Sequence, residues 1–178
     1  FMFKYSLKNG LEANIWINEV PMVIQSCKSE ILVEGSTELY ANTKKLIMEL
    51  FIPRDHNNYA LLGIDFVATN EKKVIAKINI NNQNQTKYKD AIALSIDTVT
   101  YGIIDEYKEG IINSIHKHVK SQTLPSGIIT YNISAYAEIG SSQKMFELVS
   151  DILLSLLIHD NIDEHKALQI LKGSLNIR

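Results

Sequence analysis

Two short clusters of histidine and acidic residues are the first candidates for chemistry, because imidazole and carboxylate groups are metal ligands. The first cluster, HKH at 116–118, lies in a stretch with helical spacing. Residues two apart on a helix lie about 200° round its axis, so His116 and His118 point in nearly opposite directions. We place His118 on the apolar side and His116 in solvent, and we predict no metal site here.

The second cluster, HDNIDEH at 159–165, fits the start of a helix. Asp160 or Asn161 can cap this helix, and Asp163 and Glu164 then lie in its first turn, where acids interact favourably with the helix dipole. One histidine precedes the helix and the other lies inside it, so joint metal binding would need a particular loop. We therefore interpret the cluster as structural.

Other patterns that carry chemistry do not occur in the sequence. It has no glycine-rich phosphate loop, no nucleophile elbow and no EF-hand loop. Cys27 is the single cysteine, and it falls in a predicted strand with no identifiable base nearby, which is typical of an inert thiol. We predict no catalytic residue, no metal ligand and no cofactor.

The composition indicates a globular domain without nucleic-acid or membrane contacts. Of the 178 residues, 46% are hydrophobic, and the net charge is −2 with no basic stripe of the kind that binds a phosphate backbone. No apolar run approaches the roughly 18 residues of a membrane span. A single cysteine cannot form an internal disulfide, so we expect a cytoplasmic protein.

The first seventeen residues predict a β-hairpin, since apolar residues alternate on both sides of KNG. A two-residue loop would put the two apolar sets on opposite faces. A three-residue loop, Lys8-Asn9-Gly10, pairs Leu7 with Leu11 and brings the sets onto one face. We predict the three-residue loop, and a third strand from Met22 to about Val33.

The stretch TELYANTKKLIMELF, residues 37–51, predicts an amphipathic helix. Ser36 or Thr37 can cap it, and Pro53 ends it. The apolar residues with helical spacing are Leu39, Leu46, Ile47 and Leu50.

The remaining elements follow from hydrophobic periodicity. Residues 90–99 fit a strand or a helix. In the strand at 128–137, we expect Ile129, Tyr131, Ile133 and Ala135 on one side. The other predictions are strands at 61–68 and 73–80, a helix at 103–119 with a stripe of Ile104, Tyr107, Ile111 and Ile115, an apolar helix after Gly140, and a last helix from about Asn161.

Two blocks of the sequence resemble one unit used twice. ALSIDTV and ELVSDIL align with Asp97 over Asp151, and DEYK aligns with DEHK. A real repeat favours a helix at 90–100, whereas the alternative is that both blocks are simply amphipathic. We predict one α+β domain, 1–178, with a front portion 1–120 and a back portion 121–178. Its antiparallel sheet would have about five or six strands, with helices mainly on one face.

The order of several motifs resembles the insulinase-like zinc peptidases, the group that includes the mitochondrial processing peptidase. The opening reads YSLKNGL, EANIWI, VPMVIQS and VEGSTEL, in the order of that family's first strands and its G-S-x-x-E segment. LLGIDFVATNEKKVIAKINI is similar to the strand pair after the family's metal helix, SGIITYNISAY to its G-L-A-Y segment, and DEHKALQILKGSL to its C-terminal motif.

The resemblance implies a peptidase fold without the zinc site. In active members a His-x-x-Glu-His helix follows G-S-x-x-E, and KKLIM, Lys44 to Met48, stands at that place here. Silent halves of the family often hold substrate with an Arg and a Tyr. Tyr131 matches the Tyr, whereas Thr123 or Leu124 stands at the Arg position.

We therefore expect a non-catalytic subunit that pairs with an active zinc peptidase and helps to form a peptide-binding chamber. Tyr131, Ile133 and Ala135 would bind the peptide if the edge of strand 128–137 is free. The alternative is a stand-alone peptide-binding or inhibitor protein, for example a homodimer with a peptide groove. A third interpretation is a metalloenzyme that uses His159, Asp163 and His165. The sequence leaves the peptide, the partner and the biological process open.

Overall fold

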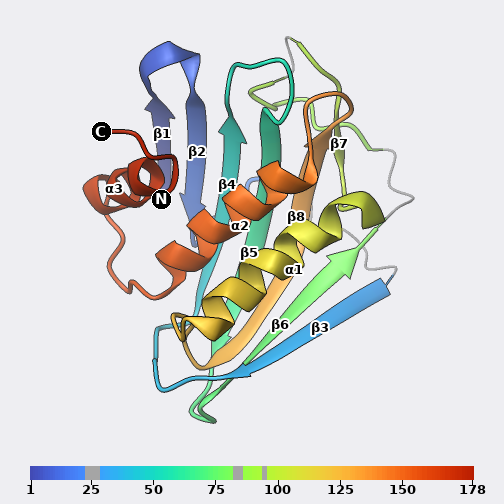
Figure 1. The fold of residues 1–178 in the computed structure, drawn as a ribbon. Coiled ribbons are helices and arrows are strands. Elements are labelled where there is room, and N and C mark those ends of the chain that lie inside the picture. The colour runs from blue at the N-terminus through green and yellow to red at the C-terminus, as the bar shows by residue number, and fades with distance from the viewer. Residues whose placement is uncertain (23–28, 82–85, 94–95) are drawn as a thin grey trace.

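The structure, a computed structural model, describes residues 1–22, 29–81, 86–93 and 96–178. In these residues eight strands form one sheet and three helices pack on it, which confirms the predicted α+β class (Figure 1). None of the helices among the described residues has the length and apolar character needed to cross a membrane. The strands are β1 (Met2–Ser6), β2 (Glu12–Ile17), β3 (Ser29–Ser36), β4 (Lys44–Phe51), β5 (Tyr59–Ala68), β6 (Lys73–Ile80), β7 (Val99–Tyr101) and β8 (Gly127–Ala137), and the helices are α1 (Asp105–Lys120), α2 (Gln143–Leu157) and α3 (Glu164–Ser174).

The sheet has more strands than expected and is not purely antiparallel. Its order is β1-β2-β4-β5-β8-β6-β3, with β7 also paired to β8, and β6 runs parallel to β8. Strand β8 thus lies between β5 and β6, which are consecutive in the sequence. Where β8 enters, Gly127 has a φ of +154°, and a Cβ atom there would lie 2.4 Å from the carbonyl oxygen of Val67. The entry point therefore requires glycine.

The N-terminal hairpin has the predicted three-residue loop. The backbone N–H of Leu7 donates to the carbonyl of Leu11 at 2.8 Å, and Gly10 takes a φ of +77°. Strand β3 lies partly within the third strand expected from Met22 to Val33. Residues 23–28 of that prediction are outside the described part of the chain.

The helix predicted for residues 37–51 is wrong. Residues 37–43 are not helical and 44–51 form β4. Leu46, Met48 and Leu50 face the core under the helices, while Ile47 faces a second core on the other side of the sheet. A strand buried on both faces has few polar positions to reveal its period of two, so its apolar residues also fit helical spacing.

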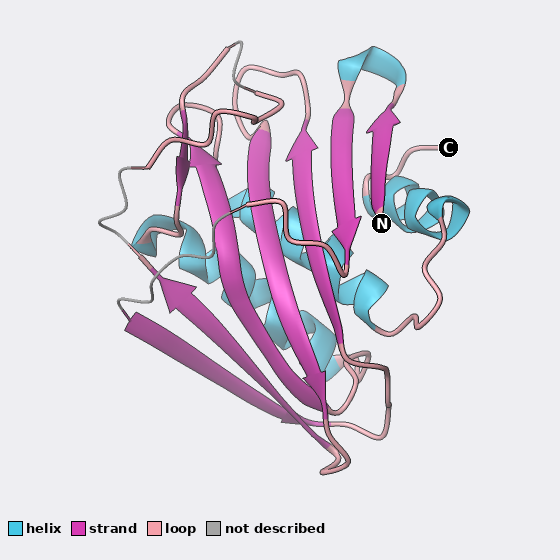
Figure 2. Ribbon diagram, turned by 180° about the vertical axis from the view of Figure 1, so that it is seen from behind, coloured by secondary structure: helices cyan, strands magenta, loops and turns pink. Residues whose placement is uncertain are grey.

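Helices α1 and α2 confirm the two predicted central helices. They cross one face of the sheet side by side, and α3 lies beside the β1–β2 hairpin (Figures 1 and 2). The predicted stripe of α1 is buried at Tyr107, Ile111 and Ile115. The last helix starts later than expected, because the side chain of Asp163 caps it by accepting from the N–H of Lys166 at 2.7 Å.

Strand β8 confirms the prediction for residues 128–137 but changes faces along its length. Gly63 pairs with Ile133 while Ile64 pairs with Tyr131, which makes Asn132 the extra residue of a β-bulge. Ile129 and Tyr131 therefore face the helices, whereas Ile133 and Ala135 belong to the second core. The expectation that these four side chains share one side is wrong beyond Tyr131.

The second core lies on the face of the sheet away from the helices. Residues 86–93 and 96–101 cover part of that face, and Tyr88 and Tyr101 pack there with ring centroids 5.3 Å apart. Of residues 90–100, those described are turns and the start of β7, so the helix favoured by the proposed repeat is absent from them. The α2 block consequently has no helical counterpart in these described residues.

Lys44 connects the start of β4 to the C-terminal end of α2. Its ammonium group donates to the carbonyls of Leu157 and His159 at 3.0 and 2.6 Å and to a carboxylate oxygen of Asp160 at 3.1 Å. The side chain is almost fully buried. A cation at this position interacts favourably with the negative end of the helix dipole and supplies donors to carbonyls that the helix leaves unpaired.

We expect Lys44→Met to lower the free energy of unfolding by about 2 kcal/mol, because the carbonyls at the end of α2 lose a charged donor. Urea unfolding of the purified protein measures this difference. Lys45→Met is the matched control, since Lys45 is half exposed in its ion pair with Asp65, and we expect a change within about 0.5 kcal/mol. Equal effects of the two variants would contradict the role given to Lys44.

Candidate binding surface

The two residues at the zinc-ligand positions of the resemblance serve the packing of the protein. Met48 is fully buried under the helices, and Lys44 holds the end of α2. Both lie on a strand, so they do not have the one-turn helical spacing of a His-x-x-Glu-His motif. The described residues contain no group of three or more His, Cys, Asp or Glu side chains placed to hold a metal ion.

The HKH cluster contributes to an interhelical network between α1 and α2. His118 lies 3.3 Å from Asp151, which also accepts from Ser114 at 2.8 Å and Lys117 at 3.2 Å. Burial raises the pKa of Asp151, but these hydrogen bonds outweigh that effect and lower it below its usual value. His116 is exposed, as predicted.

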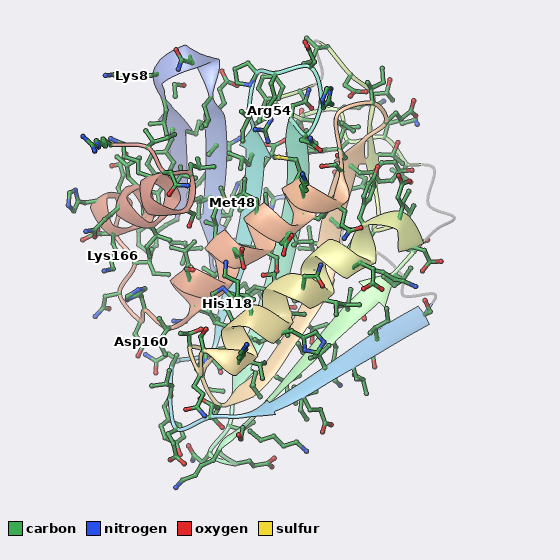
Figure 3. The ribbon with its side chains drawn as sticks, in the orientation of Figure 1. Lys8, Met48, Arg54, His118, Asp160 and Lys166 are labelled. Atoms are coloured by element: carbon green, nitrogen blue, oxygen red, sulfur yellow. The ribbon has the colours of Figure 1, made fainter. Side chains whose placement is uncertain are left out.

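The HDNIDEH cluster forms the connection between α2 and α3, with Asp160 on that connection (Figure 3). Asp160 does not cap α3. It accepts from the backbone N–H of Asn42 at 2.7 Å and from Lys44. His159 precedes α3 and His165 lies in its exposed first turn. The cluster therefore joins two helices to β4, and the structure does not gather His159, Asp163 and His165 into a metal-binding group.

The residues expected to bind a peptide are inside the protein. Tyr131 and Ala135 are fully buried, and Ile133 nearly so; the Tyr131 hydroxyl lies 2.7 Å from the hydroxyl of Ser150 on α2. Strand β8 pairs with β5 along one side and with β6 and β7 along the other. The edge at 128–137 is thus occupied by the protein's own strands and offers no site for an added peptide.

Glu49 is the one carboxyl group among the described residues that is fully buried, and it lies on the side of the second core. Its carboxylate accepts from the amide of Asn14 at 3.0 Å, the hydroxyl of Tyr59 at 2.7 Å and the backbone N–H of Ile92 at 3.1 Å. Burial raises the pKa of Glu49, and the three hydrogen bonds partly offset that rise. Burial raises the pKa of Tyr59 well above its usual value, and the nearby carboxylate of Glu49 raises it further.

The geometry around Glu49 is that of a structural clamp. Three donors occupy its two oxygens, and the side chain has no exposed area through which a substrate could reach it. The bond to Ile92 fixes the segment that covers the second core. The sequence signal for this clamp was an acid within the apolar run IMELF, because a buried charge needs hydrogen-bond partners.

The two ends of the sheet are strands β1 and β3, and they differ in how they are covered (Figures 1 and 2). Strand β1 has five residues, and α3 lies beside it, with the Tyr5 hydroxyl donating to the carbonyl of Glu164 at 2.9 Å. Strand β3 has eight residues that pair with β6 in one continuous register without a bulge. Among the described residues, no strand lies on its other side.

We call the side of residues 30–36 that faces away from β6 the β3 edge. The N–H of Thr37 donates to the carbonyl of Lys72 at 3.1 Å, in register with the β3–β6 pairing. Hydrogen-bonded pairs alternate along an antiparallel ladder, so the backbone groups of Glu30, Leu32 and Glu34 point away from β6. The β3 edge therefore presents a regular row of backbone donors and acceptors over about 23 Å.

The face of the sheet away from the helices is partly uncovered next to this edge. Leu32 on β3 and Val67 on β5 are 55% and 53% exposed, and Ile75 and Ile128 between them are partly exposed. Ile75 pairs with Ile128, and Ile128 with Val67, so these three side chains form one row across three strands. We call Leu32, Val67, Ile75 and Ile128 the open face.

The alternation in SEILVEGS was the sequence signal for this surface. Ile31 and Val33 pack toward the helices, while the alternate residues Glu30, Leu32 and Glu34 are exposed, and two of these three are acidic. Which strand ends the sheet depends on the insertion of β8, and no local pattern indicates that.

Comparisons with protein-family models, with curated proteins and with solved structures give no match to this chain.

The buried carboxyl of Glu49 predicts a distinctive pH dependence. Its pKa in the folded state is above the unfolded value of 4.5, so the folded protein binds more protons between these two values. This group therefore makes the free energy of unfolding fall as the pH rises from about 4.5 through the folded pKa. We expect Glu49→Gln to remove that decline, as measured by urea unfolding at a series of pH values.

Two further variants test the assignment. Glu71→Gln changes an exposed acid in the β5–β6 turn and should keep the wild-type pH profile. Glu49→Leu leaves three donors without an acceptor and should lower the free energy of unfolding by about 3 kcal/mol. A Glu49→Gln profile that is parallel to the wild type throughout would show that the carboxyl does not titrate as the structure implies.

Proposed function

We propose that this chain is a non-catalytic binding protein that adds an extended segment of a partner to its sheet at the β3 edge. The observation that carries the proposal is the regular, bulge-free strand β3, which pairs with β6 and, among the described residues, with no strand on its other side. Addition of a strand satisfies the row of outward backbone groups, and side chains at alternate positions supply specificity.

The features of strand β3 fit a strand that binds a partner better than an edge strand that is protected against pairing with other chains. Natural edge strands are usually short, bulged or interrupted by proline. Strand β3 has none of these three features. Within the part of the chain that the structure describes, the two glutamates of β3 are its protection of the usual kind, and charged side chains also select a partner.

Two versions of this function differ in the partner. In one, the partner is an active zinc peptidase and the two chains enclose a peptide, a version that rests on the order of motifs in the sequence. In the other, the chain binds an extended peptide without a peptidase. We favour the second version, because residues 44–51 form β4 and leave no helix where the family carries its zinc motif.

The test compares edge variants in affinity purification of the tagged protein from its own host, with co-purifying chains identified by mass spectrometry. Leu32→Pro removes a backbone N–H that points away from β6, so the strand keeps its pairing with β6 while the added strand loses a donor. Leu32→Ala removes most of the same side chain but keeps the N–H. We expect a stoichiometric partner with wild type and with Leu32→Ala, and at least ten-fold less of it with Leu32→Pro.

Controls establish that the loss arises at the edge. Circular dichroism and thermal unfolding verify that Leu32→Pro is folded, and Ser36→Pro blocks a second outward N–H if it is not. Val33→Pro removes an N–H that faces β6 and should destabilise the protein itself. If folded Leu32→Pro and folded Ser36→Pro both retain the partner, the β3 edge is excluded as the binding site. A partner that carries His-x-x-Glu-His would favour the version in which this chain pairs with a zinc peptidase.

A further inference from the structure

The side chains that flank the outward backbone groups of β3 carry a charge pattern. Glu30, Leu32 and Glu34 alternate along the strand on the face away from the helices, and all three are exposed. A strand added at the β3 edge would place its own side chains directly opposite these three, about 5 Å away. The edge therefore presents acid, aliphatic and acid at successive alternate positions.

The lysines of β6 compensate this acidity only weakly. Glu34 lies 3.5 Å from Lys73, and both side chains are about half exposed. An exposed ion pair of this kind contributes little and leaves the carboxylate accessible to a second cation. Leu32 pairs with Lys77, and Glu30 pairs with the neutral Asn79.

The aliphatic surface that Leu32 presents on β3 continues onto the neighbouring strands through the other residues of the open face. Glu34 pairs with Ile75, which begins the row that continues through Ile128 to Val67. A long apolar side chain opposite Leu32 would pack on Leu32 and reach diagonally toward this row. The surface thus favours one apolar residue between two basic residues.

The same pattern argues against a second copy of this chain as the occupant. Antiparallel pairing of two β3 edges with Leu32 opposite its own copy places Glu30 opposite Glu34 twice. Like charges directly opposite each other destabilise a sheet. The pairing that covers the exposed leucine best is therefore penalised by charge.

We infer that the segment taken up at the β3 edge belongs to a different protein and has the pattern basic-x-apolar-x-basic, in extended conformation. This inference rests on the proposed function, and it specifies the chemistry of the partner. The basic side chains lie opposite Glu30 and Glu34, and the apolar one lies opposite Leu32.

The experiment uses two synthetic, fluorescently labelled peptides with the full-length protein. The basic peptide is Thr-Lys-Val-Leu-Val-Lys-Thr, and the acidic peptide has Glu in place of both Lys. Fluorescence anisotropy at low salt should show the basic peptide binding the wild type at least ten-fold more tightly than the acidic one. The double variant Glu30→Lys with Glu34→Lys should reverse this preference. High salt should reduce both differences, because exposed charges are screened.

A matched control separates local from overall charge. Glu12→Lys with Glu19→Lys makes the same change in net charge at exposed positions near β2, at the far side of the sheet from β3. We expect this variant to keep the wild-type preference. A reversal by this control would overturn the inference, because the preference would then follow net charge.

The remaining outcomes distinguish this inference from the proposed function. If both peptides bind equally and Leu32→Pro abolishes binding of both, the edge stands as a binding site and the charge inference fails. If neither peptide binds, the charge inference also fails, whereas the host purification with edge variants still decides on the β3 edge. A dimer in sedimentation that Leu32→Pro dissociates would identify a second copy as the occupant and overturn the inference.

Discussion

The insertion of β8 between β5 and β6 is the constraint on which the arrangement of the sheet depends. Consecutive strands joined by a short turn usually pair with each other, but here a strand from the back of the chain separates them. The position of β6, parallel to β8, moves β3 to the end of the sheet. The entry of β8 is possible because residue 127 has no side chain to collide with Val67 and Phe66.

Both faces of the central strands are covered, and the two coverings are held in different ways. On one face, α1 and α2 supply aliphatic side chains and a network centred on Asp151. On the other, an irregular segment is fixed to the sheet by the carboxylate of Glu49 and by packing of Tyr88 and Tyr101. Near β3, the described side chains on the face away from the helices are partly exposed, and aliphatic and acidic side chains alternate there along the strand.

The sequence predicts those parts of the fold that depend on local pattern. The three-residue KNG loop could be predicted because it is the loop length that puts the apolar residues of both hairpin strands on one face. Helix α1 could be predicted because its buried residues form a stripe with polar residues between them. For residues 37–51 the same reasoning predicted a helix, which is wrong. Strand β4 is buried on both faces, so its sequence lacks the polar alternation that would indicate a strand. The bulge at Asn132 was equally hidden, since it depends on pairing with β5.

The candidate surface was less accessible to sequence reasoning than the fold. Tyr131, Ile133 and Ala135 were chosen as peptide-binding residues because apolar and small polar residues alternate in their strand. The same alternation occurs in an interior strand, and here a bulge places Tyr131 in the core under the helices and Ile133 and Ala135 in the second core. Glu30, Leu32 and Glu34 alternate as well, and their acidity was the better indicator of exposure. Whether such a strand is at the end of a sheet is a property of the whole topology.

The place of β8 also has a consequence for the order of events during synthesis. Strands β5 and β6 leave the ribosome long before residues 127–137, so for that interval each has an unfilled side where β8 will later pair. The loop that must close is long, and contacts between distant segments slow folding. Until its final third appears, the nascent chain has two strands that can pair along one side only, with β4 and with β3, and whose other sides are exposed to aggregation or to chaperones.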